Sequence, residues 1–220
     1  GESISMKENN KEFPSKGWIL AFHPDLICGT PLGLNIHNYT FFSYCPEEAL
    51  HLSLREKQII LEFLERIRQE LERCIDRHSK KIISKYIELL LDYCTRFYER
   101  QFITRSEVNK KVFREFNHLL DNHFNVKVSL STDVLSDEYC ANLLHLSPAY
   151  FNDLLKYEIG KEFKEYIQFK RFEIAKGWLV NTDKTLGQIA QELGFSNSQY
   201  FSRLFKKITG CSPNEFRMPN

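Results

Sequence analysis

One segment of this chain occurs twice between residues 135 and 217, and each copy predicts a short helix, a tight turn and a second helix. The first copy begins Cys-Ala-Asn-Leu-Leu-His-Leu-Ser at residue 140, and the second begins Ile-Ala-Gln-Glu-Leu-Gly-Phe-Ser at residue 189. After one extra residue in the second copy, Tyr-Phe-Asn-Asp-Leu-Leu-Lys at residue 150 aligns with Tyr-Phe-Ser-Arg-Leu-Phe-Lys at residue 200. A helical hairpin repeated only for packing is the alternative, and the matching small, apolar and turn-forming positions argue against it.

The residues that begin and end the predicted helices are repeated as well. Thr185 and Gln188 form a capping box that opens the first helix of the second copy, and Gly194 ends it because the sharp turn needs a positive φ. His145 stands at the matching turn of the first copy, and histidine enters the left-handed region more readily than most residues. Ser196 is the predicted cap of the next helix. The other matched positions are Ala141, Ala190, Ser147, Gly160 and Gly210.

Between the two copies, residues 161–181 predict one long helix. Its predicted apolar side consists of Phe163, Tyr166, Ile167, Ile174, Trp178 and Leu179. About twenty residues span roughly 30 Å, close to the roughly 34 Å between successive major-groove faces on one side of B-DNA. A rigid spacer of this length suits two recognition helices that enter adjacent turns of the double helix, and a bend in the DNA absorbs the remaining mismatch.

The second copy also carries a family resemblance. From Thr185 to Arg217, with Ile-Ala-Gln-Glu-Leu-Gly-Phe-Ser-Asn-Ser-Gln-Tyr-Phe-Ser-Arg-Leu-Phe-Lys-Lys at its centre, the chain resembles the signature of AraC/XylS-type bacterial transcription regulators. The likeness covers about residues 112–217. It implies a DNA-binding domain, double-stranded DNA as the partner and activation as the sign of control. Asp153 departs from the family pattern, because the first copy usually has a basic or neutral residue there.

Helical geometry predicts which side chains read bases. In the second copy, Phe201, Leu204 and Phe205 form the core stripe, so the polar residues between them face away. Gln199 suits a bidentate pair with adenine and Arg203 suits one with guanine. The predicted base-reading residues are Gln199, Arg203, Ser198 and Ser202 in the second copy, and Asn152 and Asp153 in the first. Ala149 and Tyr150 share the outward face of the first copy, with packing at the turn as the alternative for Tyr150 and Tyr200.

A second set of residues is expected to hold DNA phosphates and so to set the register of binding. These residues are Ser196, Asn197, Lys206, Lys207, Lys156 and Arg217. The net charge of the chain is only +1, so attraction to DNA must come from the local placement of such groups and not from bulk charge. A solvated polar face is the alternative for each of them.

The N-terminal part predicts a small β region followed by two long helices. Residues 17–24, 39–44 and 49–53 are expected to form short strands. In the family that the C-terminal part resembles, a cupin-like barrel occupies this place, and three strands cannot close a barrel. The chain begins Gly-Glu-Ser without an initiating methionine, so we expect a fragment that lacks the front of its sensor domain. A small-molecule effector is then expected only in the intact protein.

Two helices are predicted over residues 54–77 and 79–100. In the first, Ile60, Leu64, Ile67 and Leu71 recur every three or four residues, and Cys74 continues the stripe between charged neighbours. This composition fits a short coiled-coil seam between two copies of the chain, which predicts a homodimer. A hairpin in which the stripe faces the second helix of the same chain is the alternative.

Enzymatic and metal sites are not indicated. The six cysteines form no Cys-x-x-Cys pair, and several lie on apolar stripes, so buried reduced thiols in a cytoplasmic protein are expected. His23, His37 and His51 lie in the predicted β region but lack the His-x-His pattern that cupin enzymes use for metals. No phosphate-binding loop, nucleophile motif, signal peptide or membrane span is apparent, and neither a cofactor nor a membrane partner is expected.

The sequence therefore predicts a mostly α fold with an all-α C-terminal domain, preceded by a helical hairpin and a β remnant. The expected domains are residues 1–53, 54–105 and 106–220, with helix-turn-helix units at 136–160 and 185–210 and the linker helix at 161–181. The predicted function is sequence-specific regulation of transcription, with two recognition helices in successive major grooves. A protein-interaction module that no longer binds DNA is the alternative, and a cupin-type metalloenzyme is a weaker one.

Overall fold

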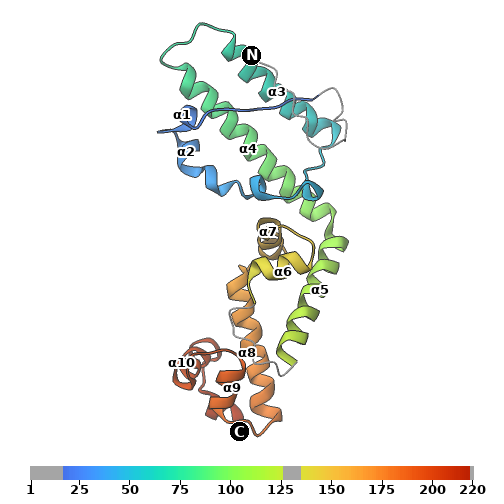
Figure 1. Cartoon of the computed structure of the whole chain (residues 1–220), viewed down its shortest axis with the longest axis vertical. Coiled ribbons are helices and arrows are strands. Elements are labelled where there is room, and N and C mark those ends of the chain that lie inside the picture. Colours follow the sequence, from blue (N-terminus) through green and yellow to red (C-terminus); the bar gives the residue numbers. More distant parts are fainter. Residues whose placement is uncertain (1–16, 126–134, 219–220) are drawn as a thin grey trace. The chain divides into compact units, whose positions relative to one another are not determined.

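The computed structural model describes residues 17–125 and 135–218, and all regular secondary structure in these ranges is helical (Figure 1). The chain divides into two compact units, which are described separately. The first unit consists of the residues up to 36 together with 54–91, and the second of residues 37–53 together with 92–220. Among the described helices, none is long and apolar enough to cross a membrane.

The first unit contains α1 (Pro24–Ile27), α2 (Pro31–Asn35), α3 (Leu54–Leu71) and the first half of α4 (Ser79–Thr104). Leu32, Ile67, Ile83 and Ile87 are among its buried apolar side chains. Gly33 allows α2 to turn back against α1, because a Cβ at this position would lie 2.2 Å from the carbonyl oxygen of Ile27.

The strands expected in the N-terminal part are absent from the residues that the structure describes. Thr40–Ser43 form the 3₁₀ helix η2 and Pro46–Glu48 form η3, while residues 17–23 and 49–53 have no regular structure. The aromatic residues that suggested a strand pack on a helix instead: the ring of Phe41 stacks on that of Tyr98 in α4 at 5.4 Å between centroids. The prediction of a β remnant is therefore wrong for these residues.

The expected seam residues of α3 differ in exposure. Ile67 is 4% exposed, Ile60 and Leu64 are half-buried, and Leu71 at the end of the helix is 60% exposed. The helix ends at Leu71, six residues before the predicted end, so Cys74 lies beyond it and is exposed. One part of the stripe is thus buried within the first unit, as the hairpin alternative requires. The other part is exposed to solvent.

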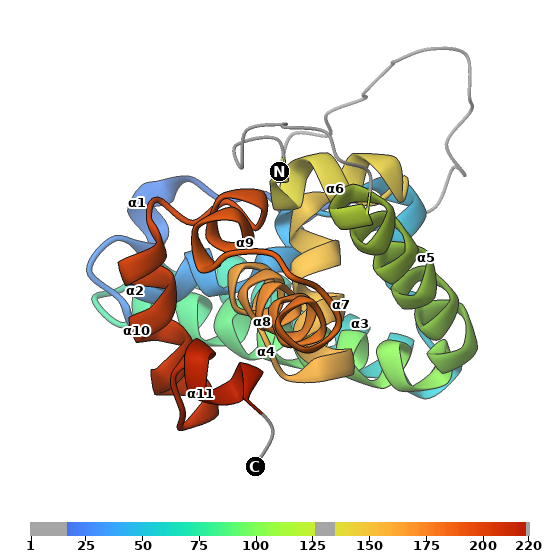
Figure 2. The same ribbon diagram turned by 90° about the horizontal axis from the view of Figure 1, so that it is seen from below.

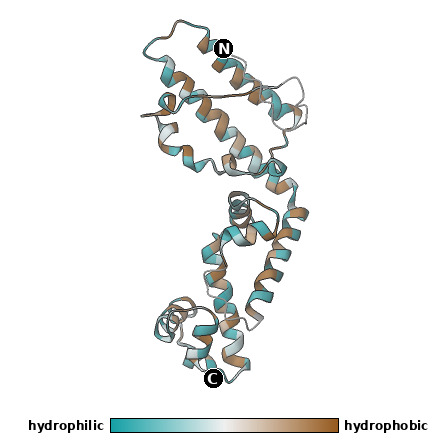
Figure 3. Ribbon diagram, in the orientation of Figure 1, coloured by the Kyte–Doolittle hydropathy of each residue, from teal (hydrophilic) through white to brown (hydrophobic). Residues whose placement is uncertain are grey.

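The second unit is built around α8 (Phe163–Asn181). The other helices are α5 (Ser106–Asn125), α6 (Asp137–Leu143), α7 (Pro148–Ile159), α9 (Leu186–Glu192), α10 (Ser198–Thr209) and α11 (Pro213–Arg217). Figure 2 shows α9 and α10 on one side of α8, and α5 and α6 on the other. Polar and apolar residues are interleaved along these helices, as their amphipathic packing requires (Figure 3).

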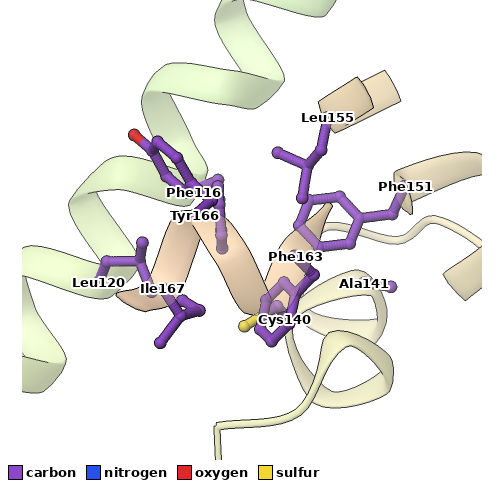
Figure 4. Close-up of a cluster of buried hydrophobic side chains, with 9 residues drawn as sticks. All are labelled: Phe116, Leu120, Cys140, Ala141, Phe151, Leu155, Phe163, Tyr166 and Ile167. Atoms are coloured by element: carbon purple, nitrogen blue, oxygen red, sulfur yellow. The ribbon is translucent and has the colours of Figure 1, made fainter. Parts of the chain in front are cut away.

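Two hydrophobic cores lie along α8, one for each copy of the repeat. The first half of α8 contributes Phe163, Tyr166 and Ile167 to a cluster with α5, α6 and α7 (Figure 4). The second half contributes Phe172, Ala175 and Leu179 to a cluster with α9 and α10. One continuous helix therefore supports both copies of the repeat. The residues of its apolar side determine where each copy packs along it.

Candidate nucleic-acid interface

The second copy of the repeat folds as helix α9, a tight turn and helix α10. Gln188 N–H donates to Thr185 Oγ1 at 3.2 Å and Thr185 N–H donates to Gln188 Oε1 at 2.8 Å, so the predicted capping box is present. Gly194 has a φ of 73°, and the N–H of Phe195 then donates to the carbonyl of Ala190 at 2.8 Å. This bond closes the turn between the two helices, and the predicted glycine supplies the left-handed residue that it needs.

Helix α10 begins at a different cap from the one predicted. The side chain of Asn197, and not that of Ser196, accepts the backbone N–H of Tyr200 at 2.7 Å. Both residues are expected phosphate ligands and both are exposed at the N-terminus of α10. Gly210 ends the helix with a φ of 85°. The N-terminus of a helix of this length, with a polar cap open to solvent, is a favourable place for a DNA phosphate.

The exposed face of α10 carries the chemistry that base recognition requires. Phe201 and Phe205 are fully buried in the core, which fixes the orientation of the helix. Gln199 and Arg203 are exposed on the other face, with Lys206 and Lys207 one turn further along. Ser198 and Ser202 are half-buried, and Ser202 Oγ donates to the backbone carbonyl of Ser198 at 2.8 Å, so the Ser202 hydroxyl is less free than expected.

The first copy has the same backbone design. Ser147 caps α7 by accepting the N–H of Tyr150 at 3.2 Å, and Gly160 ends the helix with a φ of 65°. His145 occupies the turn with a φ of 56°, and the N–H of Leu146 donates to the carbonyl of Ala141 at 2.9 Å. This bond is the counterpart of the one between Phe195 and Ala190, so the expected duplication of the turn is present in three dimensions.

The recognition face of the first copy differs from that of the second. Tyr44, which directly follows η2, donates its hydroxyl to Asp153 Oδ2 at 2.8 Å, and Asn152 Nδ2 donates to Asp137 Oδ2 at 2.9 Å. Both predicted base-reading residues of α7 are thus held by other parts of the protein and are half-buried, whereas Lys156 is exposed. Tyr44 was missed by the sequence analysis because nothing local marks a contact across 109 residues.

Arg217 is placed differently from its expected role as a phosphate ligand. Its Nε donates to the carbonyl of Leu179 at 3.3 Å, and Nη2 donates to the carbonyl of Lys184. The guanidinium group therefore connects α11 to the end of α8 and to the segment that follows it. Because these donors are occupied by backbone carbonyls, Arg217 is a structural residue in this conformation.

The cysteines are less buried than expected. Cys140 is buried, Cys94 and Cys211 are half-buried, and Cys28, Cys45 and Cys74 are exposed. Burial raises the pKa of both Cys140 and Cys94 to about 11, so these thiols stay protonated. No group of three or more potential metal ligands occurs among the described residues.

Comparison with known proteins shows what this part of the chain is similar to. A family model described as a helix-turn-helix domain matches residues 140–218. The chain is 33% identical over 111 residues to the uncharacterised HTH-type transcriptional regulator YtdP of Bacillus subtilis (strain 168). This alignment covers 50% of this chain and 14% of YtdP. The chain is 32% identical over 101 residues to the arabinose operon regulatory protein of Salmonella typhimurium (strain LT2), which covers 46% of this chain and 32% of the relative.

A solved structure, the C-terminal domain of AraT, a response regulator from Geobacillus stearothermophilus, is 33% identical with a TM-score of 0.41, covering 48% of this chain and 83% of that domain. The chain spans less than half of the length of the curated relatives that it matches. The family match coincides with the duplicated segment, its two turns and the helix that joins them. Residues 140–218 are therefore similar to a helix-turn-helix domain, and relatives that share this part of the chain are named as regulators of transcription.

Proposed function

We propose that the chain regulates transcription by binding a specific sequence of double-stranded DNA through helix α10. The observation that carries this proposal is the division of α10 into two faces. Phe201 and Phe205 anchor it in the core, while Gln199 and Arg203 point away from that core and are exposed. In the major groove, Gln199 pairs with adenine and Arg203 with guanine, the bidentate contacts that distinguish one base pair from another.

Phosphate contacts around α10 position the helix. Ser196 and Asn197 meet a phosphate at its N-terminus, and Lys206 and Lys207 meet phosphates near its last turn. The net charge of the chain is only +1, so long-range attraction to DNA is weak and these local contacts dominate binding. We therefore expect moderate affinity that falls as the salt concentration rises.

The relatives support further parts of the proposal. YtdP and the arabinose operon regulatory protein are both named as regulators of transcription. We propose activation as the sign of control, a second contact by α7 in the next major groove, and a homodimer as the state that acts on an operator.

Two substitutions in α10 test the proposal. Arg203→Ala should weaken binding to the preferred sequence by about 1–3 kcal/mol and relax the preference at one base pair. Lys207→Ala, the matched control four residues along the same helix, should weaken binding to all sequences alike and reduce the slope of log K against log salt by about one unit. Both are measured by electrophoretic mobility shift on a duplex that the wild-type chain selects from a random pool.

The two substitutions separate base reading from phosphate contact. Equal losses on selected and random DNA for Arg203→Ala would assign Arg203 to a phosphate. If the wild-type chain selects no sequence from the pool and binds no duplex, the chain does not bind DNA and the interaction-module alternative holds.

A further inference from the structure

The duplication within this chain offers an internal comparison between two recognition helices. Tyr150 in α7 and Tyr200 in α10 occupy equivalent positions, yet Tyr150 is 5% exposed and Tyr200 is 43% exposed. Asp153 is half-buried where its counterpart Arg203 is exposed. Since the two copies of the repeat share their turn geometry and the position of their cap residues, the difference comes from the segment that packs on α7.

Residues 39–51, which we name the cover segment, account for this burial. The ring of Tyr44 meets that of Tyr150 edge to face at 5.1 Å between centroids, and the Tyr44 hydroxyl donates to Asp153. Burial, together with the neighbouring Asp153 carboxylate, raises the pKa of Tyr44 well above its usual value, so this hydroxyl remains a donor at neutral pH. The face of α7 that would meet the bases is thus covered by the side chain of Tyr44.

A carboxylate of the cover segment occupies the N-terminus of α7. Glu48 is 4% exposed, and its Oε1 accepts the backbone N–H of Ser147 at 2.7 Å while its Oε2 accepts the Ser147 hydroxyl at 2.5 Å. Ser147 is the cap of α7 and the counterpart of Asn197, which is exposed at the N-terminus of α10. The N-terminus of a recognition helix is where a DNA phosphate is expected, so Glu48 stands in the place of that anion.

The cover segment is held from its other side by α4. The buried Gln101 side chain accepts the N–H of His51 at 2.8 Å and donates to the carbonyl of Ala49 at 3.2 Å. Arg100 donates to the carbonyl of His51 at 2.7 Å, and Phe102 of α4 packs against Tyr150 at 5.2 Å between ring centroids. These contacts position Tyr44 and Glu48 over α7.

A half-open cavity lies beside the contact between the cover segment and α7. A cavity of about 580 Å³ is lined by Tyr44, Tyr98 and Phe102 together with Asp153 and Lys156. A contact with an open cavity beside it buries less apolar surface than a continuous core. Separating the cover segment from α7 therefore requires less free energy than unfolding the second unit.

We propose that the cover segment and DNA compete for the same face of α7, so that the chain reads DNA with α10 alone while the cover is in place. This proposal rests on the proposed function, since it assigns the regulation of that same DNA-binding surface. Displacing the cover frees the N-terminus of α7 for a phosphate and removes the carboxylate of Glu48 from the approach of the DNA backbone. While the cover is in place, the second copy of the repeat reads one major groove through α10, and the first copy adds a second groove through α7 when the cover leaves.

The test compares the wild-type chain with the double variant Tyr44→Ala/Glu48→Ala in selection from a random duplex pool and in footprinting. We expect the wild-type chain to select a single motif and to protect one major groove. The double variant should select two motifs about 10 base pairs apart, protect two successive grooves and bind about tenfold more tightly. Its slope of log K against log salt should be steeper by about one to two units, because each added phosphate contact releases counterions.

Two further variants keep the test decisive. Phe42→Ala changes an exposed residue of η2, two residues before Tyr44, and should leave the motif, the footprint and the affinity unchanged. Tyr44→Phe keeps the ring and removes only the hydrogen bond to Asp153, so it should shift binding in the same direction as the double variant but less. If the double variant loses its cooperative thermal transition, Tyr44→Phe decides the question alone.

The outcomes separate this proposal from the proposed function. A wild-type chain that already protects two grooves, or an uncovered variant with an unchanged motif and footprint, would overturn the cover and leave DNA binding by α10 intact. A wild-type chain that binds no DNA would remove the proposed function itself. Selection of a longer site by the uncovered variants, and not by Phe42→Ala, establishes the competition.

Discussion

Arg217 shows how a basic residue near the proposed DNA-binding surface can serve the fold. Its guanidinium group donates to the carbonyls of Leu179 and Lys184, which lie at and beyond the C-terminal end of α8. Arg217→Ala leaves these carbonyls without their donor, so we expect the free energy of unfolding to fall by about 1–3 kcal/mol. Urea unfolding without DNA measures this change.

Arg217→Lys separates the structural role from phosphate binding. Lysine keeps the positive charge but lacks the planar fork that reaches two acceptors, so it should restore little of the lost stability. Restored DNA affinity in the lysine variant, with stability equal to wild type in both variants, would instead assign Arg217 to a phosphate as the sequence analysis expected.

At this scale, the residues that sequence reasoning located correctly are those with local causes. Gly194, Gly210 and His145 were predicted from the φ values that their turns need, and the structure shows these values. Glu48 and Tyr44 were missed because their partners lie 99 and 109 residues away. A buried carboxylate held by a distant helix cap leaves no periodic signal in the sequence, so only the folded arrangement shows that α7 is covered.

At the scale of elements, α8 links the two cores, and its integrity sets the relation between the two recognition helices. Phe172 is fully buried in the second core, so a proline there would damage the packing of α9 and α10 as well as the helix. Glu173 is exposed, so a proline there breaks the helix without removing a core side chain. Glu173→Pro removes one backbone hydrogen bond and kinks α8 at a cost of about 3 kcal/mol or more, while the core side chains remain.

We expect Glu173→Pro to weaken DNA binding only where both copies of the repeat contact the DNA. In the background of the double variant Tyr44→Ala/Glu48→Ala, the two-groove footprint should shrink to one groove, because the helices no longer match adjacent turns of DNA. Glu173→Ala, which also removes the ion pair with Lys176, is the matched control and should preserve the footprint. An unchanged two-groove footprint in the folded proline variant would mean that α8 does not set the spacing.

Helices were predicted well where the apolar pattern repeats over several turns, and poorly where the segments are short. The residues of α8 and α10 repeat their apolar positions over several turns, which excludes a strand. Thr40–Ser43 lie in a run of aromatic residues that fits a strand as well as a helix, and their packing on Tyr98 of α4 decides for a 3₁₀ helix. The choice depends on a tertiary contact that the sequence alone does not display.

At the scale of the whole molecule, the open question is how many chains act together. In the function that we propose, the low net charge and the use of α10 alone limit the affinity of one chain for DNA, and a dimer would raise it by placing a second α10 at high effective concentration. The stripe on α3 is the surface that we propose for this contact. Part of it is already buried within the first unit, at Ile67, so a seam between two chains must use the exposed end of the helix.

Leu71 therefore gives the sharpest test of association. It lies on the predicted stripe and is 60% exposed, so Leu71→Glu should leave the fold of one chain intact. In a dimer the same glutamate would be buried without a counter-ion, and we expect the dissociation constant to rise about tenfold or more. Leu54→Glu, at an exposed residue of α3 off the stripe, is the matched control and should not change association. Sedimentation equilibrium at tens of micromolar measures both variants beside the wild type. A monomeric wild-type chain at that concentration would exclude the seam and leave the hairpin arrangement as the reason for the stripe.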